Sequence, residues 1–87
     1  MTTIKEVIKE HEKEHPLLSV KPLEDDLILI EGDKMSLLFL SKLIQAVAES
    51  DDKIQIGPHY AGNRYFHESS QFGLYINRQE STILDLK

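Results

Sequence analysis

The chain has 87 residues, of which 40% are hydrophobic and 29% are charged. This length allows one domain, residues 1–87, with one modest core, and the abundance of Leu, Ile and Val excludes an intrinsically disordered chain. The formal net charge of −5 argues against nucleic-acid binding, because a phosphate backbone is bound by clustered Lys and Arg. The absence of cysteine excludes disulfides and thiolate metal sites.

The uninterrupted apolar runs are no longer than four residues, whereas a bilayer span needs about 20. The N-terminus also lacks the apolar core of a signal peptide. We therefore expect no membrane association and a cytoplasmic location.

The first predicted element is a helix from Thr3 to His15. Thr3 and Glu6 have the spacing of a capping box, and Pro16 moves His15 away from helical dihedral angles, which ends the helix. Because its apolar face is narrow, we expect residues 1–16 to dock at the periphery of the domain.

Two strands are predicted next. Leu18 to Pro22 alternates apolar and polar residues and contains a proline that cannot donate to a ladder, which favours an edge strand. Leu27 to Ile30 is apolar at every position, which predicts a strand that is buried on both faces or paired centrally, and we take it as the central strand. Acidic residues 24–26 form the turn between them.

Residues Asp33 to Ser50 predict the central helix, with Asp33 at its N-cap. The residues expected on its buried face share a three- and four-residue spacing: Leu37, Leu40, Leu43, Ile44 and Val47. Its apolar arc is wider than the roughly 100° stripe of a surface helix, so we expect cover on more than one side. Its acidic exit is unfavourable for the helix dipole, and Lys53 is the expected compensating cation.

The rest of the chain predicts two more strands around a loop. Lys53 to Ile56 alternates as a half-buried strand, and Phe72 to Ile76 alternates as the last strand. His59 to Gln71 is a long polar loop with aromatic residues, of a length that is often functional. Residues 79–87 either add a short edge strand or pack loosely. The sum is an α+β fold, in which a small sheet of about four strands packs against the central amphipathic helix, with an additional N-terminal helix on the same side.

The sharpest catalytic pattern is His11-Glu12-Lys13-Glu14-His15, which satisfies H-E-x-x-H. In zinc peptidases this spacing places two imidazoles on one helical face and a glutamate beside the bound water. Here the motif lies in a charged run that Pro16 ends, so we interpret it as a solvated helix end. A metal-dependent hydrolase using His11, Glu12 and His15 is the remote alternative.

The loop offers no catalytic set that matches a motif. His59, His67 and Glu68 have no defensible metal spacing, and Ser69 and Ser70 lack a nucleophile-elbow sequence. The glycines form no phosphate loop. We therefore expect a protein that is not an enzyme, with no catalytic residue, no cofactor and no bound metal.

A strand that ends in Leu29-Ile30-Glu31-Gly32-Asp33 precedes a leucine-rich helix that ends in Ala46-Val47-Ala48-Glu49. His59 and Ser70 to Ile76 follow. From Leu27 to Arg78 this order resembles small immunity proteins of bacterial polymorphic toxin systems. The resemblance implies stoichiometric neutralisation of a cognate toxin, with Glu31 as the acidic residue of the motif.

The predicted function is therefore a protein-binding module, with a toxin domain as the partner that the resemblance implies. Tyr and Arg are enriched in interface hot spots, and acidic residues steer a basic partner. The predicted partner-binding residues are Tyr60, Arg64, Tyr65, His67 and Glu68, with Glu31, Asp51 and Asp52 as acidic contributors. The alternative is a homo-oligomeric structural or regulatory protein, for example a homodimer, which the wide apolar arc of the central helix would favour.

Overall fold

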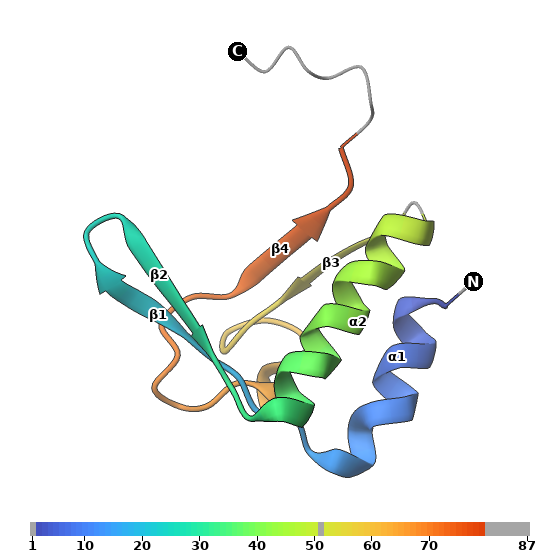
Figure 1. Cartoon of the computed structure of the whole chain (residues 1–87), viewed down its shortest axis with the longest axis horizontal. Coiled ribbons are helices and arrows are strands. Elements are labelled where there is room, and N and C mark those ends of the chain that lie inside the picture. The colour runs from blue at the N-terminus through green and yellow to red at the C-terminus, as the bar shows by residue number, and fades with distance from the viewer. Residues whose placement is uncertain (1, 51, 80–87) are drawn as a thin grey trace.

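The structure is a computed structural model that describes residues 2–50 and 52–79. It confirms the α+β class, and the two helices lie side by side with the strands beside α2 (Figure 1). The elements in chain order are α1 (Ile4–His11), a 3₁₀ turn (Glu12–Glu14), β1 (Ser19–Glu24), β2 (Leu27–Glu31), α2 (Lys34–Ser50), β3 (Lys53–Ile56), a second 3₁₀ turn (Asn63–Tyr65) and β4 (Leu74–Asn77). No helix in the described ranges is long and apolar enough to cross a membrane.

The start of α1 confirms the predicted capping box. The Glu6 N–H donates to the Thr3 hydroxyl at 3.2 Å, and the Thr3 N–H donates to the Glu6 carboxylate at 3.0 Å. The α-helix ends at His11, earlier than predicted, and continues as the 3₁₀ turn. His15 then adopts a left-handed conformation with φ of 51°, which takes it out of the helical region before Pro16.

The ends of α2 are held by two polar groups from outside the helix. The Asp33 carboxylate accepts the Ser36 N–H at 2.9 Å, as an N-cap should. At the other end, Arg78 donates to the Ala48 carbonyl at 2.9 Å. Arg78, which follows β4, therefore places a positive charge at the C-terminal end of α2, where it compensates the helix dipole. The sequence analysis named Lys53 for this role and did not predict Arg78.

The core is built around one face of α2. That face consists of Ser36, Phe39, Leu40, Leu43, Ala46 and Val47. The prediction that Leu37 and Ile44 belong to it is wrong, because both are exposed. The reason is geometric: α1 packs against the Phe39 side of α2, so the buried arc is rotated away from Leu37 and Ile44.

The four strands form two separate two-stranded antiparallel sheets, where the sequence analysis predicted one sheet. The first is the β1–β2 hairpin and the second pairs β3 with β4. Residues 65–72 lie along the first half of β1: the Leu18 N–H donates to the Tyr65 carbonyl at 2.8 Å, and the Gln71 N–H donates to the Val20 carbonyl at 2.8 Å. The predicted irregular loop therefore ties the two sheets together.

The prediction that Leu27 to Ile30 is a buried central strand is wrong. Leu27, Ile28 and Ile30 are exposed, because β2 pairs only with β1 and the hairpin extends away from the helices (Figure 1). Only the base of the hairpin, at Val20, is buried in the core.

Candidate functional site

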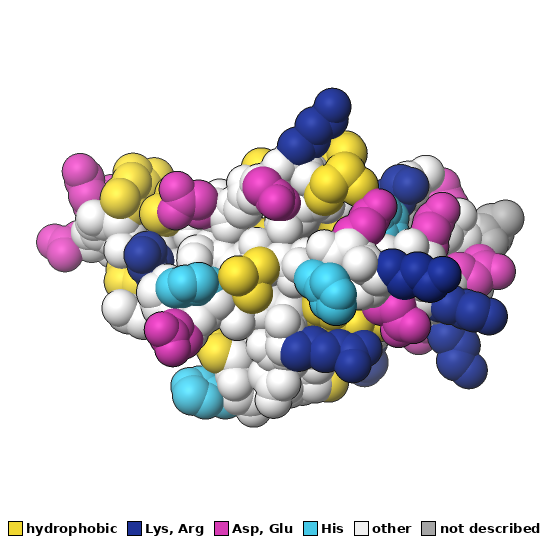
Figure 2. All heavy atoms as spheres, turned by 90° about the horizontal axis from the view of Figure 1, so that it is seen from below, with side chains coloured by type: hydrophobic (Ala, Val, Ile, Leu, Met, Phe, Trp, Pro, Cys, Tyr) yellow, Lys and Arg dark blue, Asp and Glu magenta, His cyan; other side chains and the backbone are white. Residues whose placement is uncertain are grey.

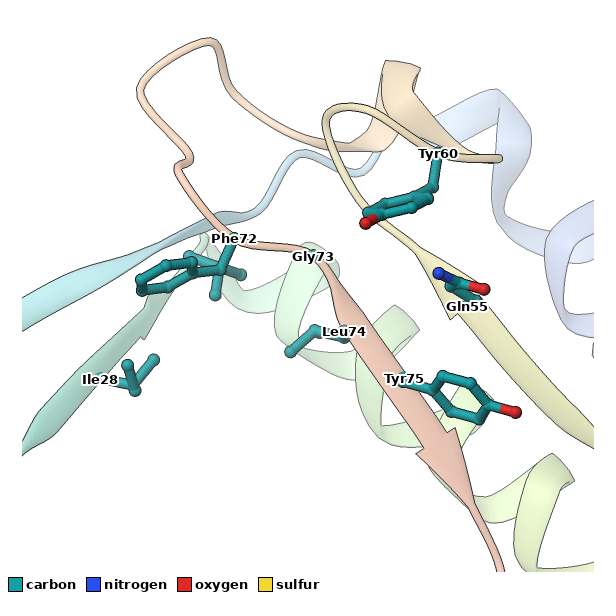
Figure 3. Close-up of a pocket in the computed structure, with 8 residues that line it drawn as sticks. Ile28, Gln55, Tyr60, Phe72, Gly73, Leu74 and Tyr75 are labelled. Atoms are coloured by element: carbon teal, nitrogen blue, oxygen red, sulfur yellow. The ribbon is translucent and has the colours of Figure 1, made fainter.

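An open groove of about 420 Å³ lies where the hairpin approaches the start of β4. Its lining comes from both sheets and the segment between them: Val20, Ile28, Gln55, Tyr60, Phe72, Gly73, Leu74 and Tyr75. In Figure 3, Ile28 and Phe72 lie close together on one side of the chain at Gly73, and Tyr60 lies on the other side. We call this pocket the groove.

Two glycines allow the backbone to form the groove. A Cβ atom on Gly73 would lie 2.6 Å from the Ile56 carbonyl oxygen and 3.1 Å from the Gly57 Cα atom. The chain entering β4 therefore lies beside the end of β3 at a distance that only glycine permits. Tyr60 packs beside Gly73 at this close approach, and Phe72, the preceding residue, lies on the side of the hairpin (Figure 3).

The groove is lined mainly by apolar and aromatic side chains. Ile28, Phe72, Tyr60 and Tyr75 are all exposed, and Gln55 is the one polar side chain, other than the tyrosine hydroxyls, among the lining residues. Among the residues that the structure describes, no charged side chain lines it. Such a surface suits apolar or aromatic side chains of a partner, because large aromatic rings supply contact area and a polar edge together.

The apolar surface continues from the groove onto the hairpin. Val20 pairs with Ile30 and Pro22 pairs with Ile28, so these four side chains share one face, which we call the hairpin apolar face. Of the four, only Val20 is buried. Unpartnered apolar faces of this kind mark interaction sites on folded proteins.

Acidic side chains surround the hairpin apolar face. Between Lys21 and Lys34 the sequence contains five acidic residues and no Lys or Arg: Glu24, Asp25, Asp26, Glu31 and Asp33. In the view from below, acidic and hydrophobic side chains lie together at the hairpin end, and most Lys and Arg side chains lie over the opposite end (Figure 2). The hairpin thus combines exposed apolar side chains with a group of acidic ones.

The structure does not bring the predicted partner-binding residues together. Tyr60 lines the groove. Arg64 and Tyr65 line a separate pocket of about 520 Å³ with Glu12, Lys13 and His15. His67, Glu68, Glu31 and Asp52 are exposed at other places, and Asp51 lies outside the described residues.

Tyr65 is a core residue and is only 5% exposed. Its ring centroid lies 5.1 Å from that of Phe39, while the Arg64 guanidinium donates to its hydroxyl at 2.8 Å and lies 4.9 Å from its ring centroid. The hydrogen bond to Tyr65 raises the pKa of Arg64 above its ordinary value. Arg64 therefore packs over Tyr65 at the surface of the core, next to Glu12, whose carboxylate lies 3.9 Å from the guanidinium.

The histidine motif lies at a helix end and is solvated at residues 12–15, as the sequence predicted, but His11 is buried. His11 is 5% exposed: its Nδ1 lies 2.9 Å from a Glu14 carboxylate oxygen, and its ring centroid lies 5.8 Å from that of Phe39. His11 follows Val7 by one helical turn on the face that packs against α2. His15 is exposed and lies beyond the 3₁₀ turn, and in residues 2–50 and 52–79 no three His, Cys, Asp or Glu side chains gather to hold a metal.

Sequence reasoning missed Ile28 and Phe72 as surface residues. The signal that could have found them is Pro22 together with the acidic turn, since both mark a hairpin that reaches solvent.

Comparison with known proteins found no family model, no curated protein and no solved structure that matches this chain.

Proposed function

We propose that this chain is a non-catalytic protein-binding module whose binding surface is the groove together with the hairpin apolar face. The observation that carries the proposal is the exposure of Ile28, Ile30 and Phe72 on neighbouring elements. Contiguous apolar surface of this kind is costly to leave in water, and a partner protein would cover it.

The nature of the surface favours a protein over a small molecule. The groove is open, and two of its lining residues, Val20 and Ile28, belong to the hairpin apolar face, so the apolar surface extends beyond the groove instead of closing around a ligand. Small-molecule sites bury most of their ligand in a cleft, whereas protein interfaces combine an apolar centre with a polar rim. Here the acidic residues 24–26 supply the rim.

The narrower form of the proposal is that the partner is a basic toxin domain, which the chain neutralises by stoichiometric binding. Two features support it: the strand–glycine–helix segment around Glu31, Gly32 and Asp33, and the acidic surroundings of the hairpin. An acidic inhibitor associates faster with a basic partner through electrostatic steering.

Capture followed by a purified binding assay tests the proposal. The native chain, an Ile28→Ser/Phe72→Ser variant and a Met35→Ser/Leu38→Ser control would be used to capture partners from the source cell. Met35 and Leu38 are similarly exposed but lie on α2 outside the groove. We expect a captured protein to bind the native chain and the control equally in calorimetry, and the groove variant at least about 10-fold more weakly.

Equal binding by the groove variant and the native chain would contradict the proposed surface. The toxin form has its own test: co-expression of the native chain should restore the growth of cells that express the captured protein, and the groove variant should not restore it. Failure of this rescue would contradict the proposal that the partner is a toxin, but it would not contradict protein binding.

One observation favours the alternative, a homo-oligomer. Leu37 and Ile44 are seven residues apart on α2, share one side of the helix and are exposed. Sedimentation velocity over a range of concentrations tests this form: a dimer that Leu37→Lys/Ile44→Lys converts to a monomer would establish it, and a native chain that stays monomeric would exclude it.

A further inference from the structure

We infer that the outer edge of β2 binds an extended strand of a cationic partner protein. This inference rests on the proposed function, because it names the docking mode and the chemistry of the partner for the same surface. It goes further in assigning main-chain hydrogen bonds to a strand edge, in addition to side-chain contacts in the groove.

The hydrogen bonds of Val20 show which way the backbone of β2 points. The Val20 N–H donates to the Ser70 hydroxyl at 3.1 Å, and its carbonyl accepts the Gln71 N–H at 2.8 Å, so both groups point away from β2. Val20 and its partner Ile30 therefore form a non-hydrogen-bonded pair, in which the Ile30 N–H and C=O point away from β1. Because the pattern repeats every two residues, Ile28 presents its N–H and C=O at the same outer edge.

The two edges of the hairpin differ in how they are protected. The edge of β1 is occupied by residues 65–72 in its first half, and Pro22, which has no N–H, follows where that cover ends. A shift in register between Pro22 and Glu24 distorts the remainder. The edge of β2 from Leu27 to Ile30 carries no proline and no charge, although these are usual means of preventing strand addition.

The side chains beside this edge favour the same mode of binding. Strand addition supplies main-chain hydrogen bonds, while alternate side chains of the added strand supply specificity. Residues of an incoming strand that lie on the same side as Ile28 and Ile30 would extend the hairpin apolar face. Ile28 already joins that face to the groove, beside Phe72.

Charge decides between a foreign strand and a second copy of this chain. An antiparallel pairing of two β2 strands that matches Ile28 with Ile30 brings the acidic turn of one copy toward Glu31 and Asp33 of the other. Lys34 of one copy would face Glu24 of the other, but residues 21–34 contain five acidic side chains against two lysines, Lys21 and Lys34, so each copy brings a net charge of −3 to this pairing. A strand that alternates apolar residues with Lys or Arg places opposite charges at both ends of the edge.

Two synthetic peptides test the inference against the full-length, ¹⁵N-labelled chain by NMR. One peptide of eight residues alternates valine with lysine, and the matched control alternates valine with glutamate. We expect the lysine peptide to shift the amide resonances of Ile28 and Ile30 in a saturable way, with an affinity that falls as salt is added. The glutamate peptide should leave them unchanged at the same concentration.

Two variants separate the strand edge from the fold. Ile28→Pro removes an outward N–H but no hydrogen bond to β1, so it should keep the remaining amide spectrum and bind the lysine peptide at least about 10-fold more weakly. Asp25→Lys/Asp26→Lys keeps the backbone and should reverse the preference, so that the glutamate peptide binds better than the lysine peptide. Leu38→Thr, at an exposed apolar position of α2, is the control that should bind like the native chain.

The inference would be overturned if millimolar lysine peptide did not shift the Ile28 and Ile30 resonances, or if it shifted only resonances of β4. It would also be overturned if the Ile28 and Ile30 resonances shifted when the chain alone was concentrated, because the strand bound at this edge would then be a second copy. Its failure is distinguishable from failure of the proposed function. If a captured partner requires Phe72 but binds the Ile28→Pro variant with native affinity, strand addition at β2 is contradicted, while the proposal of a protein-binding module is supported.

Discussion

The two two-stranded sheets have the same pattern of paired apolar residues, but one sheet buries them in the core and the other leaves most of them exposed to solvent. In the β3–β4 sheet, Ile54 pairs with Ile76 and Ile56 pairs with Leu74, and all four pack in or against the core. In the β1–β2 hairpin, the face that begins with Val20 is covered only at its base. Alternation of apolar residues therefore determines that a strand has an apolar face, but the helix that covers the face determines whether it is buried.

The first test of this difference has the largest expected effect on stability. Ile56→Ala removes a side chain that is 4% exposed, and we expect a loss of about 2–5 kcal/mol in the free energy of unfolding, because a cavity remains under α2. Ile28→Ala removes a side chain that is 52% exposed and should change the free energy by no more than about 0.5 kcal/mol. Urea denaturation of both variants measures the two values, and equal losses would contradict the difference between the sheets.

The second test disturbs the close approach of the two backbone segments at the end of the β3–β4 sheet. Gly73→Ala places a Cβ atom 2.6 Å from the Ile56 carbonyl oxygen, a backbone atom that cannot rotate away. We expect a loss of about 3 kcal/mol, the upper part of the range for overpacking. Gln71→Ala, two residues earlier and exposed, is the control, and thermal unfolding of both variants decides whether the close approach is required.

The third test loosens the base of the β1–β2 hairpin. The Ser70 hydroxyl accepts the Val20 N–H at 3.1 Å and donates to the Leu18 carbonyl at 3.1 Å, and both bonds are buried. Ser70→Ala leaves the Val20 N–H without this partner and should cost about 1–2 kcal/mol. Hydrogen exchange should accelerate at Val20 more than at Ile54, and a uniform acceleration would show that the two sheets open as one unit.

The smallest effect concerns the junction between β2 and α2. Hydrogen bonds from the Ser36 side chain and then its backbone N–H lower the pKa of Asp33, so its carboxylate stabilises the folded state at pH values above the ordinary carboxyl pKa. That contribution is lost as the pH falls through the lowered pKa. Asp33→Asn caps the helix without titrating, and it should lose less stability than the native chain in acid denaturation; identical acid profiles would contradict this role.

Local features of the fold were predictable because they depend on neighbouring residues. The Thr3–Glu6 capping box, the Asp33 cap and the order of the helices and strands were all visible in the sequence. The burial of α2 was predicted less well. Its sequence is apolar on nearly all sides, so periodicity could not identify which arc meets α1 and the strands, and Leu37 and Ile44 were assigned to the wrong side.

The candidate site could not be predicted because it depends on contacts between distant residues. Ile28 and Phe72 are brought together only after residues 65–72 lie along β1 and the two glycines at 57 and 73 meet. The loop from His59 to Gln71 was correctly identified as unusual, but its Tyr65 and Phe66 fill the core instead of facing solvent. Tyr60 is the predicted partner-binding residue that also lines the groove.

The pairing of residues 65–72 with β1 has a consequence for the folding kinetics. Val20 and Ile30 are ten residues apart and can meet early, whereas Leu18 and Phe66 are 48 residues apart and meet only after a large loop has closed. We therefore expect the β1–β2 hairpin to gain its anchor late in folding, and its edges to be open to another strand while the protein is being made.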